Sequence, residues 1–195
     1  TAKKKLMWNM AGSLCNSLSS MLLLIIVNRI SGESRGGFFA LAYSTAQLLF
    51  SVGGFEIRPV QSTDIKNKFT FNQYFTSRML NCIIMLICMI GYIVVNGYTG
   101  VEALTVFWIL GYRMVEAVAD VYSGLFQQRE RIDISGKEML MRSGISTITF
   151  TIILWLTDNL LYAAMTLTLT SLVIMLFYDL HMKKYFEPTP VHLEW

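Results

Sequence analysis

Long apolar runs recur along the whole chain, separated by short polar or glycine-containing stretches. Each run is about 20 residues long, which is the length that an α-helix needs to cross the hydrocarbon core of a bilayer. The strict alternation of apolar and polar residues that is typical of β-barrel strands does not occur in them. The pattern therefore predicts six membrane-spanning helices, at about residues 6–30, 37–57, 79–95, 103–126, 139–156 and 160–180.

The composition supports an all-α, polytopic membrane protein. Of the 195 residues, 54% are hydrophobic and 15% charged, whereas a soluble domain carries about a quarter charged residues. We predict one six-helix transmembrane domain over residues 1–181, and a cytoplasmic tail or inter-lobe linker over 182–195. This leaves no room for a soluble catalytic domain. The Walker loop, the GxGxxG fingerprint and the HExxH and GxSxG motifs are absent, so we expect neither an enzyme nor ATP-driven transport by this chain itself.

Lysine and arginine are distributed unevenly between the two sides of the predicted membrane domain. One side holds the N-terminus, the second and fourth loops and the tail, with 13 of the 16 basic residues. These are Lys3, Lys4, Lys5, Arg58, Lys66, Lys68, Arg78, Arg129, Arg131, Lys137, Arg142, Lys183 and Lys184. The loops on the other side hold only Arg29 and Arg35. Because cytoplasmic loops are enriched in lysine and arginine, we predict that both chain ends are cytoplasmic.

The cysteines and histidines do not form a pattern that binds metal. Cys15, Cys82 and Cys88 lie inside predicted apolar spans, where cysteine behaves as a small hydrophobic residue. His181 and His192 lie at or beyond the last span and have no carboxylate or cysteine partner nearby in the sequence. We therefore predict no disulfide and no metal site, and we expect no nucleic-acid partner.

The fourth span carries polar side chains that lipid would not tolerate. Arg113, Glu116, Asp120 and Gln127 follow one another at steps of three, four and seven residues, which places them on one face of a helix. Each charge at the centre of a bilayer costs about 2.5–3.5 kcal/mol on insertion scales, so these groups must face other helices or a water-filled cavity. We expect a cavity, lined also by Arg142 of the fifth span. The alternative is that Arg113 and Glu116 neutralise each other as a structural pair.

Other spans carry small and polar residues at helical spacing. They are Gly12, Asn16 and Ser19 or Ser20 in the first span, Ala40, Ser44, Gln47 and Ser51 in the second, and Arg142, Ser146 and Thr149 in the fifth. Small residues allow helices to pack closely, which is one interpretation. The other is that these faces also line a polar cavity.

The loop after the second span is polar and basic. Its residues Arg58, Gln61, Asp64 and Arg78, together with Arg131 of the fourth loop, form a candidate cytoplasmic entrance. The planar fork of donors on arginine suits phosphate groups, so such a loop would attract anionic headgroups. The alternative is a solvated loop that merely follows the charge bias of cytoplasmic segments.

Taken in chain order, these residues resemble a known family. The run from Tyr112 to Lys137, followed by Arg142, resembles the fourth and fifth spans of Wzx-like polysaccharide flippases of the multidrug/oligosaccharidyl-lipid/polysaccharide exporter superfamily. The run from Phe55 to Arg78 is similar to the loop after their second span, although Glu56 stands where the family usually has glycine. Asn9, Gly12 and the glycines at 32, 36 and 37 resemble their first hairpin.

The resemblance implies a transporter of twelve to fourteen helices in two six-helix lobes, of which this chain would be the N-terminal one. Such proteins move an undecaprenyl-pyrophosphate-linked oligosaccharide across the bacterial inner membrane, from the cytoplasmic to the outer leaflet, for cell-surface polysaccharides. Arg113 would then contact the pyrophosphate or hold the charge pattern of the cavity. Glu116 and Asp120 would be counter-charges or a relay for protons or sodium.

The partners implied by the resemblance are the lipid-linked oligosaccharide, the bilayer, a C-terminal lobe or second chain, a glycan polymerase and glycosyltransferases. No cofactor is expected beyond a proton or sodium gradient. Two alternatives stay open. One is another exporter of the superfamily, either a drug/cation antiporter or a peptidoglycan-precursor flippase. The other is a non-transporting scaffold of a glycan-assembly complex, whose intramembrane charges would pair with a partner's helix.

Overall fold

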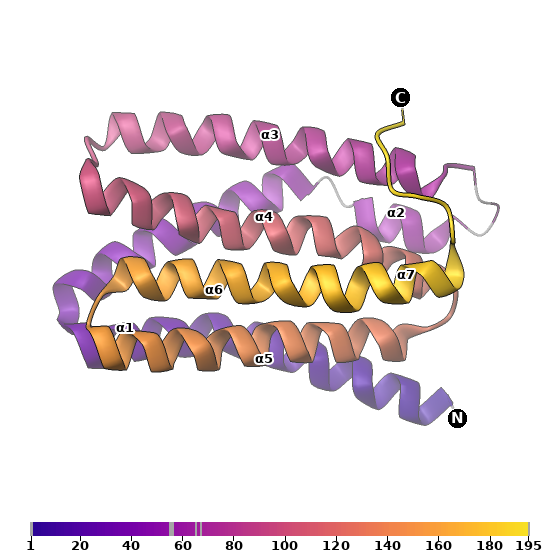
Figure 1. Ribbon diagram of the computed structural model, residues 1–195, viewed down its shortest axis with the longest axis horizontal. Helices are drawn as coiled ribbons and strands as arrows, with labels where there is room; N and C mark the ends of the chain where they lie inside the picture. The colour runs from indigo at the N-terminus through magenta and orange to yellow at the C-terminus, as the bar shows by residue number, and fades with distance from the viewer. Residues whose placement is uncertain (1, 55–56, 65, 67, 195) are drawn as a thin grey trace.

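The regular elements of the structure, a computed structural model, are all helical over the residues that it describes, which are 2–54, 57–64, 66 and 68–194 (Figure 1). Phe55 and Glu56, two residues of the family resemblance, lie outside this part. The elements are α1 (Ala2–Gly54), α2 (Ile57–Thr63), α3 (Phe71–Val95), α4 (Gly100–Gln128), α5 (Ile132–Thr157), α6 (Leu160–Ile174), the π-helix η1 (Met175–Asp179) and α7 (Leu180–Phe186). The predicted all-α fold is confirmed.

Four stretches of helix are long and apolar enough to cross a membrane: Lys3–Ser51, Phe71–Val95, Ile132–Thr157 and Leu160–Phe186. The fold is therefore that of a polytopic membrane protein. The helix α4 is not among the four, and it carries three charged residues between positions 113 and 120. The predicted number of six spans stays a prediction.

The helices run back and forth along one axis, and both termini lie at the same end of the bundle (Figure 1). This end also carries α2 and the turn between α4 and α5, and we call it the basic end because the lysines and arginines counted above gather on these segments. The kink in α1 and the turns after α3 and α5 lie at the opposite end. The arrangement agrees with the predicted alternation of loops; which side of the membrane each end faces stays a prediction.

A single residue breaks α1 into two arms. Gly32 has φ 85° and ψ 170°, whereas the residues on both sides of it are helical. The predicted spans 6–30 and 37–57 leave a connection of several residues here, so the turn is shorter than expected. Only glycine adopts such backbone angles without strain, because it has no Cβ atom.

Replacing Gly32 by alanine is expected to lower the free energy of unfolding by about 1–3 kcal/mol, since an L-residue at these angles is strained. Thermal unfolding of the purified protein in detergent measures the loss. Gly37→Ala is the matched control, because a Cβ atom there would meet nothing within 4 Å. Equal melting temperatures for the two variants would contradict the assignment of Gly32 as the joint.

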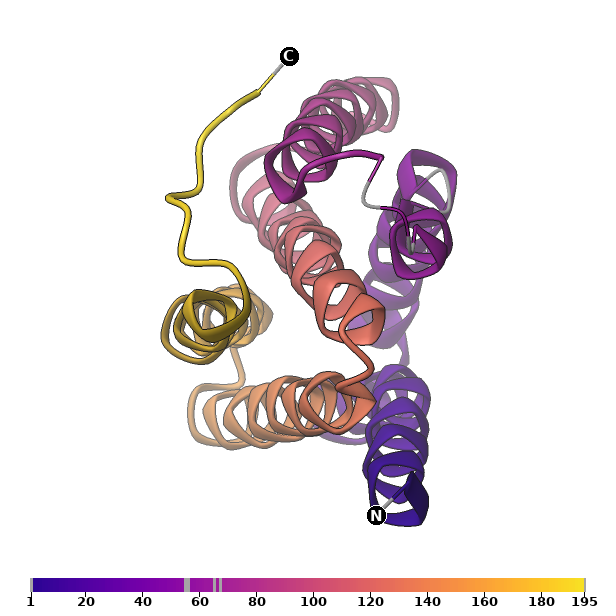
Figure 2. The ribbon, with the colours of Figure 1, turned by 90° about the vertical axis from the view of Figure 1, so that its right-hand side faces the viewer.

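The helix α4 crosses the centre of the bundle, as the view along the helices shows (Figure 2). The larger hydrophobic core joins it to α1, α3, α5 and α6, through residues such as Phe39, Met85, Leu110, Phe150 and Leu167. A second apolar cluster lies towards the basic end. It contains Phe71, Tyr122, Phe126 and Ile134, with Phe186 packed against them. A central position explains why α4 tolerates charges: its neighbours are protein on several sides.

The helices α1 and α5 touch backbone to backbone. A Cβ atom added at Gly12 would lie 2.9 Å from the carbonyl carbon of Gly136, and one added at Gly136 would lie 2.5 Å from the Cα atom of Asn9. Further along both helices, the Ser143 hydroxyl donates a hydrogen bond to the Cys15 sulfur at 3.3 Å. For Gly12, the structure thus shows the close packing that small residues allow.

The third helix begins eight residues earlier than predicted, at Phe71. Thr70 accepts a hydrogen bond from the backbone N–H of Gln73, whose side chain accepts one from the backbone N–H of Thr70, so the start is a complete capping box. The prediction that placed Arg78 in a cytoplasmic loop is therefore wrong. Arg78 lies inside α3 and is buried.

The last helix continues beyond the predicted span, to Phe186, so the predicted tail from residue 182 starts inside α7. The segment after it folds back over the start of α3. Asn72 donates to the carbonyl of Pro190 at 3.3 Å, and the backbone N–H of Glu194 donates to the Thr76 hydroxyl at 2.7 Å. The segment 187–194 is thus attached to the lobe rather than extended from it.

Candidate functional site

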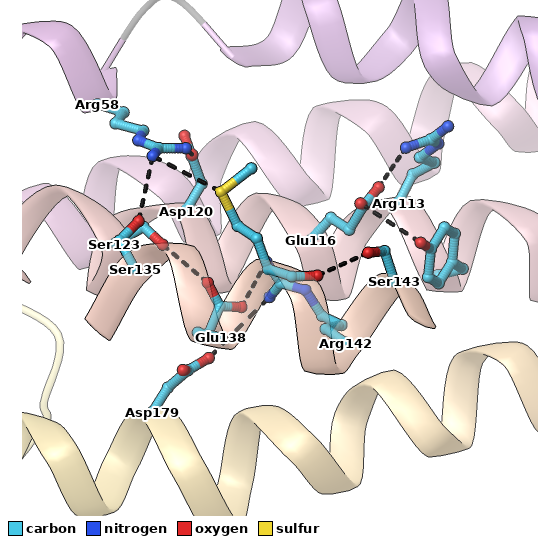
Figure 3. A network of polar contacts seen from close by, with 12 residues as sticks. Arg58, Arg113, Glu116, Asp120, Ser123, Ser135, Glu138, Arg142, Ser143 and Asp179 are labelled. Atoms are coloured by element: carbon cyan, nitrogen blue, oxygen red, sulfur yellow. Dashed lines mark hydrogen bonds and ion pairs between the residues drawn. The ribbon is translucent and has the colours of Figure 1, made fainter. Parts of the chain in front are cut away.

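Charged side chains from five helical elements form a polar line through the interior of the bundle, and Figure 3 labels all of them except Arg78. Three groups follow one another from the basic end inwards. They are the Asp120 cluster (Arg58, Arg78, Asp120), the Arg142 cluster (Glu138, Arg142, Asp179) and the Arg113–Glu116 pair.

The Asp120 cluster joins α2, α3 and α4 around one carboxylate. Arg58 Nη1 lies 3.0 Å from Asp120 Oδ1, and Arg78 Nη2 lies 3.0 Å from Asp120 Oδ2. Arg58 also donates to the Ser135 hydroxyl of α5 at 3.3 Å. Two guanidinium groups, one from α2 and one from α3, thus meet at one carboxylate of α4.

The members of the Asp120 cluster differ in exposure. The side chain of Arg78 is 2% exposed, whereas those of Arg58 and Asp120 are 23% and 19% exposed. Asp120 lies eight residues before the end of α4, or about 12 Å along the helix. The guanidinium of Arg58 is therefore partly accessible at a modest depth below the basic end.

The Arg142 cluster is buried completely. Glu138 Oε1 lies 2.6 Å from Arg142 Nη2, and the other carboxylate oxygen of Glu138 accepts a hydrogen bond from the Ser123 hydroxyl at 2.9 Å. Asp179 faces the same guanidinium from η1, with Oδ2 4.0 Å from Arg142 Nη1. Both carboxylates have an exposed fraction of 0%. Two acidic side chains thus share one arginine in the interior of the bundle.

The Arg113–Glu116 pair lies near the middle of α4. The two side chains form an ion pair, and the Tyr112 hydroxyl donates to Glu116 Oε1 at 3.4 Å. The Arg113 guanidinium also lies over the ring of Tyr43, 4.4 Å from its centroid, and the Tyr43 hydroxyl donates to Ser20 across the two arms of α1. Arg113 and Glu116 are 4% and 5% exposed, so they face protein in this conformation.

This geometry matches the alternative in which Arg113 and Glu116 neutralise each other. It also agrees with the expectation that the charges on α4 face other helices. A water-filled cavity around them, and their contact with a substrate, stay predictions.

The candidate entrance residues do not come together as one surface. Arg58 joins the Asp120 cluster, whereas Gln61 is buried between α2 and α4, where a Cβ atom at Gly124 would overlap its side-chain amide. The Arg131 guanidinium donates two hydrogen bonds to the Asp133 carboxylate, at 3.0 and 3.1 Å. Gln127 lies partly exposed near the end of α4.

Asp64 shapes its own loop. Its carboxylate accepts hydrogen bonds from the backbone N–H groups of Lys68 and Phe69, at 3.0 and 3.1 Å, and from the Tyr74 hydroxyl at 3.1 Å. These hydrogen bonds hold the pKa of the Asp64 carboxyl below its usual value, and the bond from the Lys68 N–H has the largest effect. The Gln128 amide donates to the backbone carbonyl of Asp64 at 2.6 Å. Asp64 therefore ties the loop after α2 to the end of α4.

Two acidic members of the polar line, Glu138 and Asp179, were missed among the candidate residues. A signal for each is present in the sequence. Glu138 stands four residues before Arg142, the spacing at which helical side chains form ion pairs. Asp179 interrupts an otherwise apolar span, the same argument that selected the charges of α4.

The chain matches the family model described as "Polysaccharide biosynthesis protein" over residues 2–193, which include every member of the polar line. The searches of curated proteins and of solved structures give no match.

Proposed function

We propose that this chain forms one lobe of a flippase for lipid-linked oligosaccharides. The basis is that it belongs to the polysaccharide biosynthesis protein family. The substrate would be an undecaprenyl-pyrophosphate-linked sugar unit, moved from the cytoplasmic to the outer leaflet of the bacterial inner membrane. The family is that of the Wzx-like flippases, which are transporters rather than enzymes. The basic end would face the cytoplasm.

Flipping requires that a diphosphate and hydroxyl-rich sugars cross a hydrocarbon layer. Each unpaired polar group there costs several kcal/mol, so the protein must offer charge and hydrogen bonds along the path. The observation that carries the proposal is the Asp120 cluster, in which the partly exposed guanidinium of Arg58 lies just inside the basic end. A pyrophosphate arriving from that side would meet a guanidinium there.

Arg58 is the residue that we assign to this first contact. Arg78, Arg113 and Arg142 are each at most 6% exposed, so they are covered in this conformation. Arg131 is more exposed, but Asp133 already occupies its donor fork. Arg58 donates to Asp120 and Ser135 while part of its side chain stays accessible.

Arg58→Gln is expected to reduce flipping of a fluorescent lipid-linked oligosaccharide in proteoliposomes by about 10- to 100-fold. Charge-assisted hydrogen bonds are worth about 1.5–3 kcal/mol, and each 1.4 kcal/mol is about a factor of ten. The variant should still fold, because Asp120 keeps Arg78 as a counter-ion.

Arg35→Gln is the matched control. Arg35 pairs with Asp158 at the same distance of 3.0 Å but at the opposite end of the bundle, with both side chains exposed. We expect it to flip substrate at the wild-type rate. Wild-type flipping by Arg58→Gln, or an equal loss in both variants, would refute the role of Arg58.

The scaffold alternative receives no support from the pairing of the charges. It requires that the intramembrane groups bind a helix of another protein. In the structure Arg113, Asp120 and Arg142 each find an opposite charge within the chain. Labelling of cysteines introduced at positions 113, 116 and 120 tests the remaining question, since a transport cavity admits a water-soluble reagent during turnover and a sealed interface does not.

A further inference from the structure

The Arg142 cluster holds more buried acid than buried base. Glu138 and Asp179 are both inaccessible, and the one guanidinium that reaches them is committed to Glu138, at 2.6 Å. Neither carboxylate oxygen of Asp179 has a hydrogen-bond partner among the described residues. An ionised carboxylate without hydrogen bonds in a dry interior is among the most costly arrangements in a folded protein.

The π-helix is what turns Asp179 towards α5. Buried residues follow one another in steps of four from Ser171 through Met175 and Asp179 to Lys183. In a regular α-helix three such steps drift by about 120° around the axis, because four residues make slightly more than a turn. The wider turn of η1 accommodates one extra residue, about 100° of rotation, which removes most of this drift.

The charges around Asp179 do not offer it a second cation, because Lys183, four residues further on, donates to the backbone carbonyl of Thr189 instead. Glu138 and Arg142 act on it from α5, Tyr122 from α4, and Tyr178 is its neighbour on η1. Arg58 acts on Glu138 from the side of α2, but it is bound to Asp120 and partly exposed to solvent. Further along the seam between α5 and α6, the hydroxyls of Ser146 and Ser171 are also buried without hydrogen-bond partners among the described residues.

We propose that Asp179 is a proton-binding site, and that it carries the proton in the conformation seen here. Neutral Asp179 removes the excess negative charge and leaves Arg142 paired with Glu138 alone. Loss of the proton, from carboxylic acid to carboxylate and free proton, puts two carboxylates on one guanidinium. The deprotonated state is relieved when η1 returns to α-helical register, which turns Asp179 by about 100° away from the cluster.

This site differs from the relay that the sequence suggested. Glu116 is paired with Arg113, and Asp120 is held between two arginines, so neither carboxylate lacks a counter-charge. Proton binding at Asp179 stands independently of the proposed function. Its use as the coupling step of transport rests on that function.

Infrared spectroscopy of the purified protein in nanodiscs tests the site, because a neutral carboxylic acid has a carbonyl band that a carboxylate lacks. We expect the wild type to show such a band from a buried acid at neutral pH. Asp179→Asn should remove it, and the control variant Asp158→Asn, which changes an exposed carboxylate at the opposite end of the bundle, should keep it. A wild type without the band, or a band kept in Asp179→Asn, overturns the proposal.

Thermal unfolding gives a second readout, which compares the wild type with Asp179→Asn over a range of pH. If Asp179 is protonated in the folded state and ionised in the unfolded state, the folded state binds more protons, so stability falls as the pH rises. We expect the melting temperature of the wild type to decline from acidic pH through neutral pH. Asp179→Asn should match the wild type at acidic pH and lose most of this decline, so it should melt at a higher temperature than the wild type at neutral pH. An unchanged decline in Asp179→Asn counts against the site.

Transport adds the coupling test. In proteoliposomes we expect an imposed pH gradient to change wild-type flipping several-fold and to leave Asp179→Asn unaffected. If the infrared band behaves as expected but the gradient has no effect, the coupling role fails and the proton site stands. If the wild type flips no lipid-linked oligosaccharide at all, the proposed function fails, and the spectroscopic result still decides the site.

Discussion

Arg142→Met should destabilise the folded protein by about 3–5 kcal/mol, the cost of leaving a buried charge without its partner. Methionine matches the length of the arginine stem but carries no charge. Glu138, which is fully buried, would keep only the Ser123 hydroxyl as a partner. Thermal unfolding and the yield of monodisperse protein from membranes measure the effect.

The double variants identify which carboxylate is charged. Arg142→Met combined with Glu138→Gln removes both members of the ion pair, so we expect most of the stability to return. Arg142→Met combined with Asp179→Asn should stay unstable, because Asp179 already carries a proton in our interpretation. If the double variant with Asp179→Asn were the more stable of the two, the charge would lie on Asp179. If Arg142→Met alone were as stable as the wild type, the cluster would contribute little to folding.

Gly136→Ala is expected to separate α1 from α5 and to lower the free energy of unfolding by about 3 kcal/mol, at the upper end for overpacking substitutions. The added methyl group would overlap the backbone of Trp8 and Asn9. A side chain could rotate away from such a contact, but backbone atoms move only if the whole helix moves. The folded fraction, measured by size-exclusion chromatography with fluorescence detection, should fall sharply.

Gly91→Ala is the control for this substitution. Gly91 lies on α3, where a Cβ atom would meet nothing within 4 Å, so alanine there should be neutral or should stabilise the helix by up to about 1 kcal/mol. Gly12→Ala tests the same contact from α1, since its methyl group would meet the backbone of Gly136. Normal folding of both Gly12→Ala and Gly136→Ala would mean that the two helices do not touch as described.

The helical fold follows from the length and spacing of the apolar runs. The last predicted span begins at residue 160 and α6 begins at Leu160, because the polar turn before it is unambiguous. The start of α3 was placed too late, since hydropathy alone discards its polar first turns. The capping residues Thr70 and Gln73 were the better guide, because they satisfy backbone groups whatever the hydropathy.

The candidate site was predicted less completely than the fold. Spacing on α4 selected Arg113, Glu116 and Asp120, and all three belong to the polar line. Spacing within one helix does not identify partners on other helices, so the bonds from Arg58 and Arg78 to Asp120 were not foreseen. The burial of Asp179 depends on a π-helical turn, which a hydropathy pattern does not reveal.

The hinge at Gly32 determines how motion can travel through the lobe. Its two arms meet at one residue and are also joined by the hydrogen bond from Tyr43 to Ser20, so a tilt of the first arm pulls on the second. Tilting the first arm would act as a lever on the second, whose Tyr43 ring lies against Arg113. A rearrangement that begins at the membrane surface furthest from the basic end would then reach the charged interior mechanically, without a ligand moving between them.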